Sequence, residues 1–383
     1  MGDSHNARNS LYTNLNTRAY STDGAMYWAL IQTGFKLQMG MTANRAVVGA
    51  GFTGVGLLDV ANQLPGVYSE NPDCVVVSVG TNSAASVTFQ EWKDYLTSYR
   101  DLLLANTNAS TIVFMPTLPK RSTAPFDPAT DQRRKDINDW QQTDEFIISP
   151  RIRSFAVPAV IEGVPNVAYF ADDLHLNYLG AWVEANEGII PALASAQPLG
   201  DIASVYDGSG FATNPRLAGG AALAPGLSLL TNVGGAIATQ SKNGADKQVL
   251  SLVSPLLTVT VSRRADYEYV NSALVGVVAG DAVDSVAVYR ITADTVGMLI
   301  PQTISAVGNG GTGLCQIQST PSLFTLPEMP MPAGTVLTLR GPVVLVGAGS
   351  PNRWTEVCRS EISNSATTCN DNVILEYVNG RKV

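Results

Sequence analysis

The stretch CVVVSVGTN, residues 74–82, decides the fold of the first half of the chain. Its β-branched run Val75–Val79 predicts a short buried strand, which the turn Gly80-Thr81-Asn82 ends. Downstream, Phe89–Ala105 predicts a helix, because its apolar residues recur at spacings of three and four. Ile112–Met115 and Val167–Phe170 predict two further buried strands. This alternation of strands and helices, up to about residue 197, indicates an α/β domain with a parallel sheet.

The second half of the chain differs from the first in composition and in the spacing of its apolar runs. After Pro198-Leu199-Gly200 come Gly- and Ala-rich turns and then many short runs with almost no helical period. This spacing is typical of an all-β sandwich or jelly roll. The runs that we expect to form strands are Val249–Val253, Leu257–Ser262, Leu274–Val278, Val283–Arg290, Val336–Arg340 and Val343–Val346. We therefore expect two domains, residues 1–197 and residues 205–383.

Charge and hydropathy disfavour several classes of partner. The chain of 383 residues carries 24 Lys and Arg against 32 Asp and Glu, a formal net charge of −8, without a basic cluster. Since nucleic-acid binding depends on basic contacts to phosphates, no nucleic-acid partner is expected. No apolar run approaches the roughly 20 residues that cross a bilayer, so no membrane span is expected either.

The cysteines and the longer polar stretches leave alternatives open. None of the four cysteines has the paired CxxC spacing of a zinc or redox site, and we expect neither a metal nor a cofactor. Cys74 is expected to be a buried thiol. Cys358 and Cys369 either form a disulfide that closes a loop or remain unpaired. Asn6–Asp23 and Pro119–Asp136 predict long polar loops, which are either walls of a substrate cleft or solvated surface.

The chain has only two histidines, which narrows the choice of a general base. His5 adjoins Ser4, and adjacent side chains point apart in regular backbone, so His5 is poorly placed to deprotonate that serine. His175 follows Asp172 by three residues in a turn before a predicted helix. A carboxylate at this spacing can accept a hydrogen bond from the imidazole Nδ1 and leave Nε2 to take a proton. The alternative is an Asp that merely caps a helix beside a partly exposed histidine.

The Asp172-x-x-His175 pair does not stand alone. Gly2-Asp3-Ser4, the stretch from Asn44 to Gly49, Gly80-Thr81-Asn82 and then this pair occur in the order and rough spacing of four blocks. In this respect the chain resembles the SGNH, or GDSL-type, hydrolases over about residues 1–197. The resemblance implies a three-layer, flavodoxin-like parallel sheet, and its specificity comes from the order of the blocks more than from any one of them.

Carried over residue by residue, the resemblance implies a serine esterase site. Ser4 would be the nucleophile, with Asp172 and His175 as the rest of the triad. The backbone N–H of Gly49 and the side-chain amide of Asn82 would be the oxyanion donors. These roles are chemically reasonable, because a developing oxyanion needs preorganised neutral donors and a glycine allows close backbone approach.

Two features depart from the family pattern. Ser83 stands where the third block commonly ends in Asp, which puts a supporting contact in doubt and leaves the Asn82 donor in place. The family also has a β-strand directly before Gly-Asp-Ser, whereas only Met1 precedes it here. We expect that the natural chain extends before Met1, since loss of a central strand would expose sheet edges.

A rival motif overlaps the second block. Gly49-Ala50-Gly51-Phe52-Thr53-Gly54 is a literal GxGxxG after an apolar run, as in dinucleotide-binding folds. That kind of site also needs an acidic residue at the end of a second strand about 20 residues further on. Glu70 falls instead in what the sequence predicts to be a polar turn, which disfavours the nucleotide hypothesis.

Residues 205–383 contain no histidine and no second catalytic set, so a binding or assembly role is expected there. They loosely resemble the β-sandwich modules attached to SGNH domains in bacteriophage tail fibres and tailspikes. The pairing implies an esterase or deacetylase that removes acyl groups, acetyl above all, from a bacterial surface polysaccharide, in a virion tail or another extracellular setting. A homotrimer with other tail proteins as partners is implied too. The alternative is a structural or receptor-binding tail protein whose SGNH site is weak or inactive.

Overall fold

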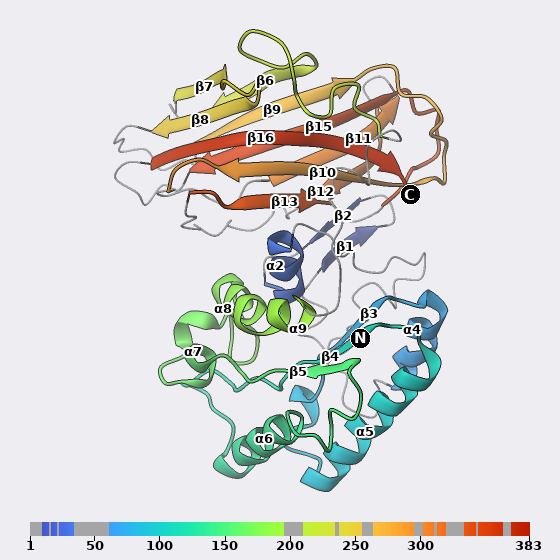
Figure 1. Cartoon of the computed structure of the whole chain (residues 1–383), viewed down its shortest axis with the longest axis vertical. Coiled ribbons are helices and arrows are strands. Elements are labelled where there is room, and N and C mark those ends of the chain that lie inside the picture. Colours follow the sequence, from blue (N-terminus) through green and yellow to red (C-terminus); the bar gives the residue numbers. More distant parts are fainter. Residues whose placement is uncertain are drawn as a thin grey trace. The chain divides into compact units, whose positions relative to one another are not determined.

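The structure, a computed structural model, divides into two compact units (Figure 1). It describes residues 10–14, 17–20, 23–33, 61–194, 210–233, 237–254, 263–294, 302–309, 312–318, 333–341, 344–362 and 369–383. The first unit contains most of the N-terminal half and the helices. The second contains the C-terminal half together with two short N-terminal segments, Leu11–Tyr20 and Ile31–Leu37.

The first unit is built on a parallel sheet with the order β3-β4-β5. β3 (Cys74–Val77) and β4 (Thr111–Phe114) confirm two of the predicted strands, while β5 is the short segment Ile152–Ser154. All four β4 residues are buried, as expected for a central strand of β-branched and aromatic side chains. The α/β class of this unit is therefore confirmed for the described residues.

Helix α5 (Phe89–Asn106) confirms the predicted helix and packs against the sheet. Thr88 caps it reciprocally: its hydroxyl accepts from the Glu91 N–H, and the Glu91 carboxylate accepts from the Thr88 N–H at 2.8 Å. Trp92, Leu96 and Leu103 recur on the buried face and join the strands in one apolar core.

The remaining helical segments lie before, between and after these three strands in chain order, and only the end of α2 belongs to the second unit (Figure 1). They are α2 (Ala25–Gln32), η1 (Ala61–Gln63), α4 (Leu64–Glu70), η2 (Thr81–Ser83), α6 (Pro128–Trp140), α7 (Ala159–Glu162), η3 (Val167–Tyr169), α8 (Tyr178–Glu184), the π-helical η4 (Ala185–Ile189) and α9 (Ile190–Ala194). α6 shares the core of β3, β4 and α5, and α9 contacts β4. In α2, Trp28 packs edge-on against Trp182 of α8 at 5.3 Å between ring centroids.

The third predicted strand, Val167–Phe170, is wrong. Val167–Tyr169 form the 3-10 helix η3, and Phe170 makes only an isolated antiparallel bridge to Leu176. Val167 is 39% exposed, so its branched side chain does not enter a sheet. The third parallel strand is β5, whose sequence Ile152-Arg153-Ser154 has too few apolar residues to stand out as a strand.

Both predicted polar loops contain regular structure. The stretch Pro119–Asp136 runs into α6, which begins where the Asp127 side chain accepts from the N–H groups of Ala129 and Thr130. The stretch Asn6–Asp23 contains β1 (Ser10–Asn14) and β2 (Thr17–Tyr20). These strands extend the sheet of the second unit, because β2 pairs in parallel with β12. The proposed boundary at 197–205 does not anticipate this N-terminal contribution.

The second unit has the two sheets of a β-sandwich-like fold, as its sequence predicts. One sheet has seven strands in the order β1-β2-β12-β11-β15-β9-β6, and the other has the order β13-β10-β16-β8-β7 with β14 also on β10. The strands not yet introduced are β6 (Leu227–Val233), β7 (Ile237–Lys242), β8 (Gln248–Ser254), β9 (Arg263–Asn271), β10 (Ala282–Ile291), β11 (Gln302–Asn309), β12 (Thr312–Gln318), β13 (Val336–Arg340), β14 (Val344–Leu345), β15 (Arg353–Ile362) and β16 (Cys369–Lys382).

Four of the predicted strands of this unit correspond to β8, β10, β13 and β14. Leu274–Val278 is not a strand, and its Val275 and Val278 are exposed by 85% and 58%. Of Leu257–Ser262, no residue lies in the described part of the chain. Cys358 is a buried free thiol, so of the two alternatives for Cys358 and Cys369 the disulfide is not formed, and Cys74, expected to be buried, is a half-buried free thiol.

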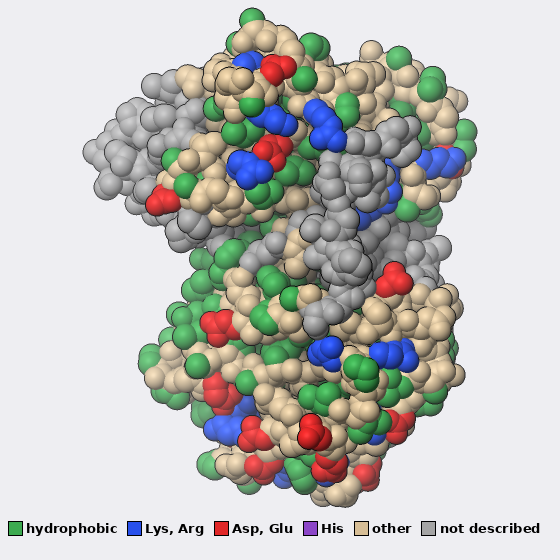
Figure 2. Space-filling model, viewed as in Figure 1, with side chains coloured by type: hydrophobic (Ala, Val, Ile, Leu, Met, Phe, Trp, Pro, Cys, Tyr) green, Lys and Arg blue, Asp and Glu red, His purple; other side chains and the backbone are tan. Residues whose placement is uncertain are grey.

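The visible surface is mixed in charge. Figure 2 shows Lys and Arg side chains interspersed with Asp and Glu on the face in view. Across the described residues, no helix is both long and apolar enough to cross a membrane.

Candidate active site

The turn Ala171–Leu176 brings Asp172 and His175 together. The Asp172 carboxylate lies 2.9 Å (Oδ2) and 3.1 Å (Oδ1) from His175 Nδ1. Its Oδ1 also accepts from the backbone N–H groups of Leu174 at 2.8 Å and His175 at 2.7 Å. The hydrogen bond expected from the Asp-x-x-His spacing is therefore present, and it engages Nδ1 of the ring.

The turn is fastened at both of its ends. The N–H of Ala171 donates to the carbonyl of His175 at 2.8 Å, next to the bridge between Phe170 and Leu176. Phe170 and Leu176 are buried in a small apolar cluster with Leu118. A turn held by backbone bonds and an apolar base keeps its side chains in place, as a catalytic group requires.

Helix α8 begins directly after the turn and holds its far side. Asn177 caps the helix by accepting from the N–H groups of Leu179 and Gly180. The Asn177 amide also donates to the carbonyl of Ala168 at 2.8 Å, and its backbone N–H donates to Tyr169. The helix predicted after His175 is thus confirmed, and its cap ties the turn to η3.

The environment of Asp172 favours the carboxylate. Partial burial by itself would raise the pKa of Asp172. The backbone N–H groups of His175 and Leu174 and the His175 ring outweigh it and hold the pKa of that carboxyl well below its usual range. Asp172 is therefore ionised at neutral pH, as a group that orients an imidazole must be.

Asn82 lies on the 3-10 helix η2, after the carboxyl end of β3. Its side chain is exposed, whereas its neighbours Thr81 and Ser83 are buried. Gly80 opens this segment with φ of 130°, and a Cβ there would lie 2.5 Å from Thr117 Oγ1 and from the Trp92 ring. Only glycine fits this conformation and this close approach, so Gly80 determines how η2 leaves the strand.

The other site residues of the resemblance lie outside the described residues. Ser4 and Gly49 are in this group, as are the rest of the first two blocks and the GxGxxG stretch 49–54. Their roles and that of Asn82 stay predictions. The structure brings Asp172 and His175 together and places Asn82 at the carboxyl edge of the sheet, where open α/β sheets carry their sites. Glu70 of the rival motif ends α4 and is not in a polar turn.

Sequence reasoning missed an ion pair at the turn. Arg121 Nη2 lies 2.8 Å from Asp173 Oδ1, and the Arg121 N–H donates to the Asp173 carbonyl at 3.0 Å. Asp173 is the residue after Asp172, so Arg121 binds the same turn. The only available signal was that Arg121 falls in a polar stretch after β4, and this does not specify a partner.

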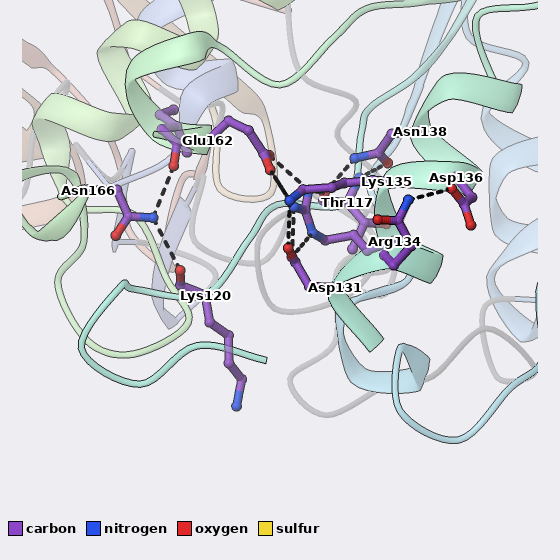
Figure 3. Close-up of polar contacts among 11 residues, drawn as sticks. Thr117, Lys120, Asp131, Arg134, Lys135, Asp136, Asn138, Glu162 and Asn166 are labelled. Carbon is purple, nitrogen blue, oxygen red and sulfur yellow. Dashed lines mark hydrogen bonds and ion pairs between the residues drawn. The ribbon is translucent and has the colours of Figure 1, made fainter. Parts of the chain in front are cut away.

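A polar network around the buried Arg134 joins α6 to Thr117 and Glu162 (Figure 3). Arg134 of α6 is fully buried, and its guanidinium donates to both oxygens of Glu162 at 2.9 and 2.6 Å. It also pairs with Asp131 and donates to the carbonyl of Thr117. Asn138 both accepts from the Thr117 N–H and donates to the Thr117 carbonyl, each at 2.9 Å.

Within the described residues, no group of three or more His, Cys, Asp and Glu side chains could hold a metal ion.

No protein-family model and no curated protein match the sequence. Among solved structures, a GDSL-like lipase from Parabacteroides merdae ATCC 43184 is similar at 17% identity, with 49% of this chain and 90% of that chain covered and a TM-score of 0.36. A peptidoglycan O-acetylesterase is similar at 15% identity, with 38% and 45% covered and a TM-score of 0.29.

A third similar structure is the enzymatically active domain of tailspike protein 4 from bacteriophage CBA120. It is 12% identical, 42% of this chain is covered, and the TM-score is 0.27. This chain spans 20% of that tailspike structure. All three likenesses are distant and partial.

Proposed function

We propose that the first unit is a serine hydrolase that cleaves acyl esters, with Ser4 as nucleophile and His175 as general base oriented by Asp172. The observation that carries this proposal is the 2.9 Å contact between Asp172 Oδ2 and His175 Nδ1, on a turn fastened at both ends. A carboxylate on Nδ1 fixes the tautomer in which Nε2 accepts a proton. The chain's other histidine, His5, adjoins Ser4 and is poorly placed for this role.

The proposed reaction proceeds through an acyl-enzyme. Ser4 Oγ attacks the ester carbonyl carbon while its proton passes to His175 Nε2. The negative oxygen of the tetrahedral intermediate accepts from the Asn82 side-chain amide and from the N–H groups of Gly49 and Ser4. The departing alcohol takes the proton from His175, and water then releases the acid by the same steps in reverse.

We further propose that the substrate is a carbohydrate that carries an ester-linked acyl group, most simply acetyl. The second unit would bind this glycan. The support is the domain pairing: a β-sandwich without a histidine follows the unit that holds the Asp172–His175 pair. The same proposal gives the first unit a three-layer, flavodoxin-like sheet. It also locates the protein in a virion tail.

The test is hydrolysis of p-nitrophenyl acetate by the wild-type chain, Ser4→Ala and His175→Ala, each with its melting temperature measured. We expect turnover by the wild type and a loss on the order of 10³-fold or more in both variants at unchanged melting temperature. Equal and slow rates in all three proteins would overturn the hydrolase proposal. They would favour a binding protein with an inactive site.

A further inference from the structure

Arg121 holds the residue next to Asp172 by two bonds of different kinds. Its guanidinium pairs with the Asp173 side chain at 2.8 Å, and its backbone N–H donates to the Asp173 carbonyl at 3.0 Å. The ion pair alone would be weak, since the two side chains are 33% and 55% exposed. The two bonds together fix both the backbone and the side chain at this position of the turn.

The segment that carries Arg121 is anchored on both sides of it. Asn166, which is 2% exposed, donates from Nδ2 to the carbonyl of Lys120 at 3.1 Å and accepts at Oδ1 from the N–H of Ser122 at 2.6 Å. The same amide donates to the carbonyl of Ile161. A buried side-chain amide with all these bonds satisfied keeps the backbone from Lys120 to Ser122 in one position (Figure 3).

The start of this segment is tied to the chain between β3 and Asn82. Thr117 is bound by Asn138 and Arg134 of α6, and its hydroxyl donates to the carbonyl of Val79 at 3.3 Å. Arg133, the residue before Arg134 in α6, donates to the carbonyl of Ala84 at 2.8 Å. The loop after β4 and the residues flanking Asn82 are therefore held by one helix.

We propose that Arg121 is a positioning residue for the Asp172–His175 pair, which it holds in register with the Asn82 segment through the loop after β4. The inference rests on the proposed function, since it assigns Arg121 to the same site. Arg121 acts through Asp173 and the turn, without touching the reacting atoms. Its loss lets the turn shift, and a misplacement of about 1 Å in a catalytic group is enough to slow chemistry up to about 10²-fold.

The experiment is a double-mutant cycle with p-nitrophenyl acetate, using Arg121→Gln, Asp173→Asn and the double variant. We expect kcat to fall about tenfold or more in each single variant while KM stays within about twofold, since ground-state binding is untouched. The double variant should lose no more than either single one, because both remove one interaction. Arg121→Lys keeps the charge without the planar guanidinium and should recover part of the rate.

Arg290→Gln is the matched control, because Arg290 also pairs its guanidinium with a carboxylate, that of Glu376 in the second unit, at 2.6 Å from Nε to Oε1. Its kcat should equal that of the wild type. If Arg121→Gln and Asp173→Asn keep kcat within about twofold of an active wild type, the positioning role is overturned while the hydrolase proposal stands.

A second readout does not depend on turnover. In a chain with only two histidines, the imidazole signals of ¹⁵N-histidine-labelled protein report the Nδ1 bond of His175 directly. We expect Arg121→Gln to weaken the signal of that hydrogen-bonded proton and Arg290→Gln to leave it unchanged. An unchanged His175 signal in Arg121→Gln would overturn the inference even if the wild type shows no esterase activity.

Discussion

The Asp172 carboxylate accepts hydrogen bonds from donors of the same turn, residues 171–176. Two are backbone N–H groups and the third is the Nδ1 of His175. Because its folded pKa lies below the unfolded value, the ionised group stabilises the folded turn at neutral pH. This contribution is lost only as the pH falls towards the folded pKa. Asp172 therefore stays charged throughout the pH range in which a histidine base works.

We predict that Asp172→Asn lowers kcat for p-nitrophenyl acetate by about 10³- to 10⁴-fold, because an amide no longer selects the productive imidazole tautomer. The melting temperature should fall as well, because asparagine keeps an oxygen that accepts from the backbone N–H groups of the turn but lacks the charge that strengthens these bonds. Steady-state kinetics with differential scanning fluorimetry measure both. Asp144→Asn, at an exposed site away from this turn, is the control and should have wild-type kinetics. A kcat for Asp172→Asn within about tenfold of the wild type would remove Asp172 from the triad.

At the scale of elements, α6 is the support on which the loops of the candidate site depend. It places a fully buried arginine between two acids and next to the loop after β4. An arginine is suited to this position because its planar fork binds Glu162 through two bonds and still has donors for Asp131 and Thr117.

We predict that Arg134→Met destabilises the first unit by about 3 kcal/mol. This is the lower end of the cost of removing one partner of a buried ion pair, because Asp131 and Glu162 keep 29% and 30% exposure. Urea unfolding followed by tryptophan fluorescence is a suitable assay, since Trp28, Trp92, Trp140 and Trp182 lie in this unit.

Lys135→Met is the matched control for Arg134→Met. Lys135 is the next residue, pairs with the same two acids, and is 46% exposed. Its loss should cost no more than about 0.5 kcal/mol, as for other exposed pairs. Equal effects of the two substitutions would contradict the structural role assigned to the buried arginine.

Elements with a strong local pattern could be predicted from the sequence. The runs at Cys74–Val77 and Thr111–Phe114 and the periodic helix at Phe89–Asn106 are of this kind. The Nδ1 bond of His175 was also predictable, because Asp172 and His175 are three residues apart on one turn. In each case the residues that decide the structure are neighbours in sequence.

The features that could not be predicted depend on residues that are far apart in the sequence. Arg121 meets Asp173 across 52 positions, and β2 pairs with β12 across most of the chain. β5 is a strand because β4 offers it an edge, with little help from its own three residues. The strand predicted at Val167–Phe170 was wrong for the opposite reason. Val167, Tyr169 and Phe170 are residue types that favour strands, but η3 joins none of the sheets of the described residues and Val167 stays exposed.

At the scale of the whole molecule, the second unit contains a carboxyl group that makes its stability depend on pH. Glu356 on β15 is fully buried, and burial raises its pKa to about 8, an effect that the nearby hydroxyls of Ser305, Thr303 and Ser285 offset only in part. The folded unit thus keeps a proton on Glu356 that the unfolded chain loses above its ordinary pKa of 4.5. The folded state binds more protons in this range, so stability falls as the pH rises from about 4.5 through 8.

We predict that Glu356→Gln removes this part of the pH dependence. The variant should match the wild type in melting temperature near pH 5 and exceed it near pH 8, because glutamine mimics the protonated acid. Calorimetric scans across this range provide the measurement. Glu376→Gln, whose carboxylate accepts from Arg290 at 2.6 Å, should retain the wild-type slope. Parallel curves for the wild type and Glu356→Gln would show that Glu356 is not protonated in the fold.

The proposed catalytic unit as a whole is tested most directly by covalent labelling of Ser4. Folded wild-type protein is treated with a fluorophosphonate, and the modified residue is located by peptide mass spectrometry beside His175→Ala and urea-unfolded wild type. We expect an adduct on Ser4 in folded wild type, which is lost in the variant and on unfolding, because the serine reacts only when His175 takes its proton. Absence of the Ser4 adduct, or equal labelling in all three samples, would contradict the assignment of Ser4, Asp172 and His175 as a catalytic triad.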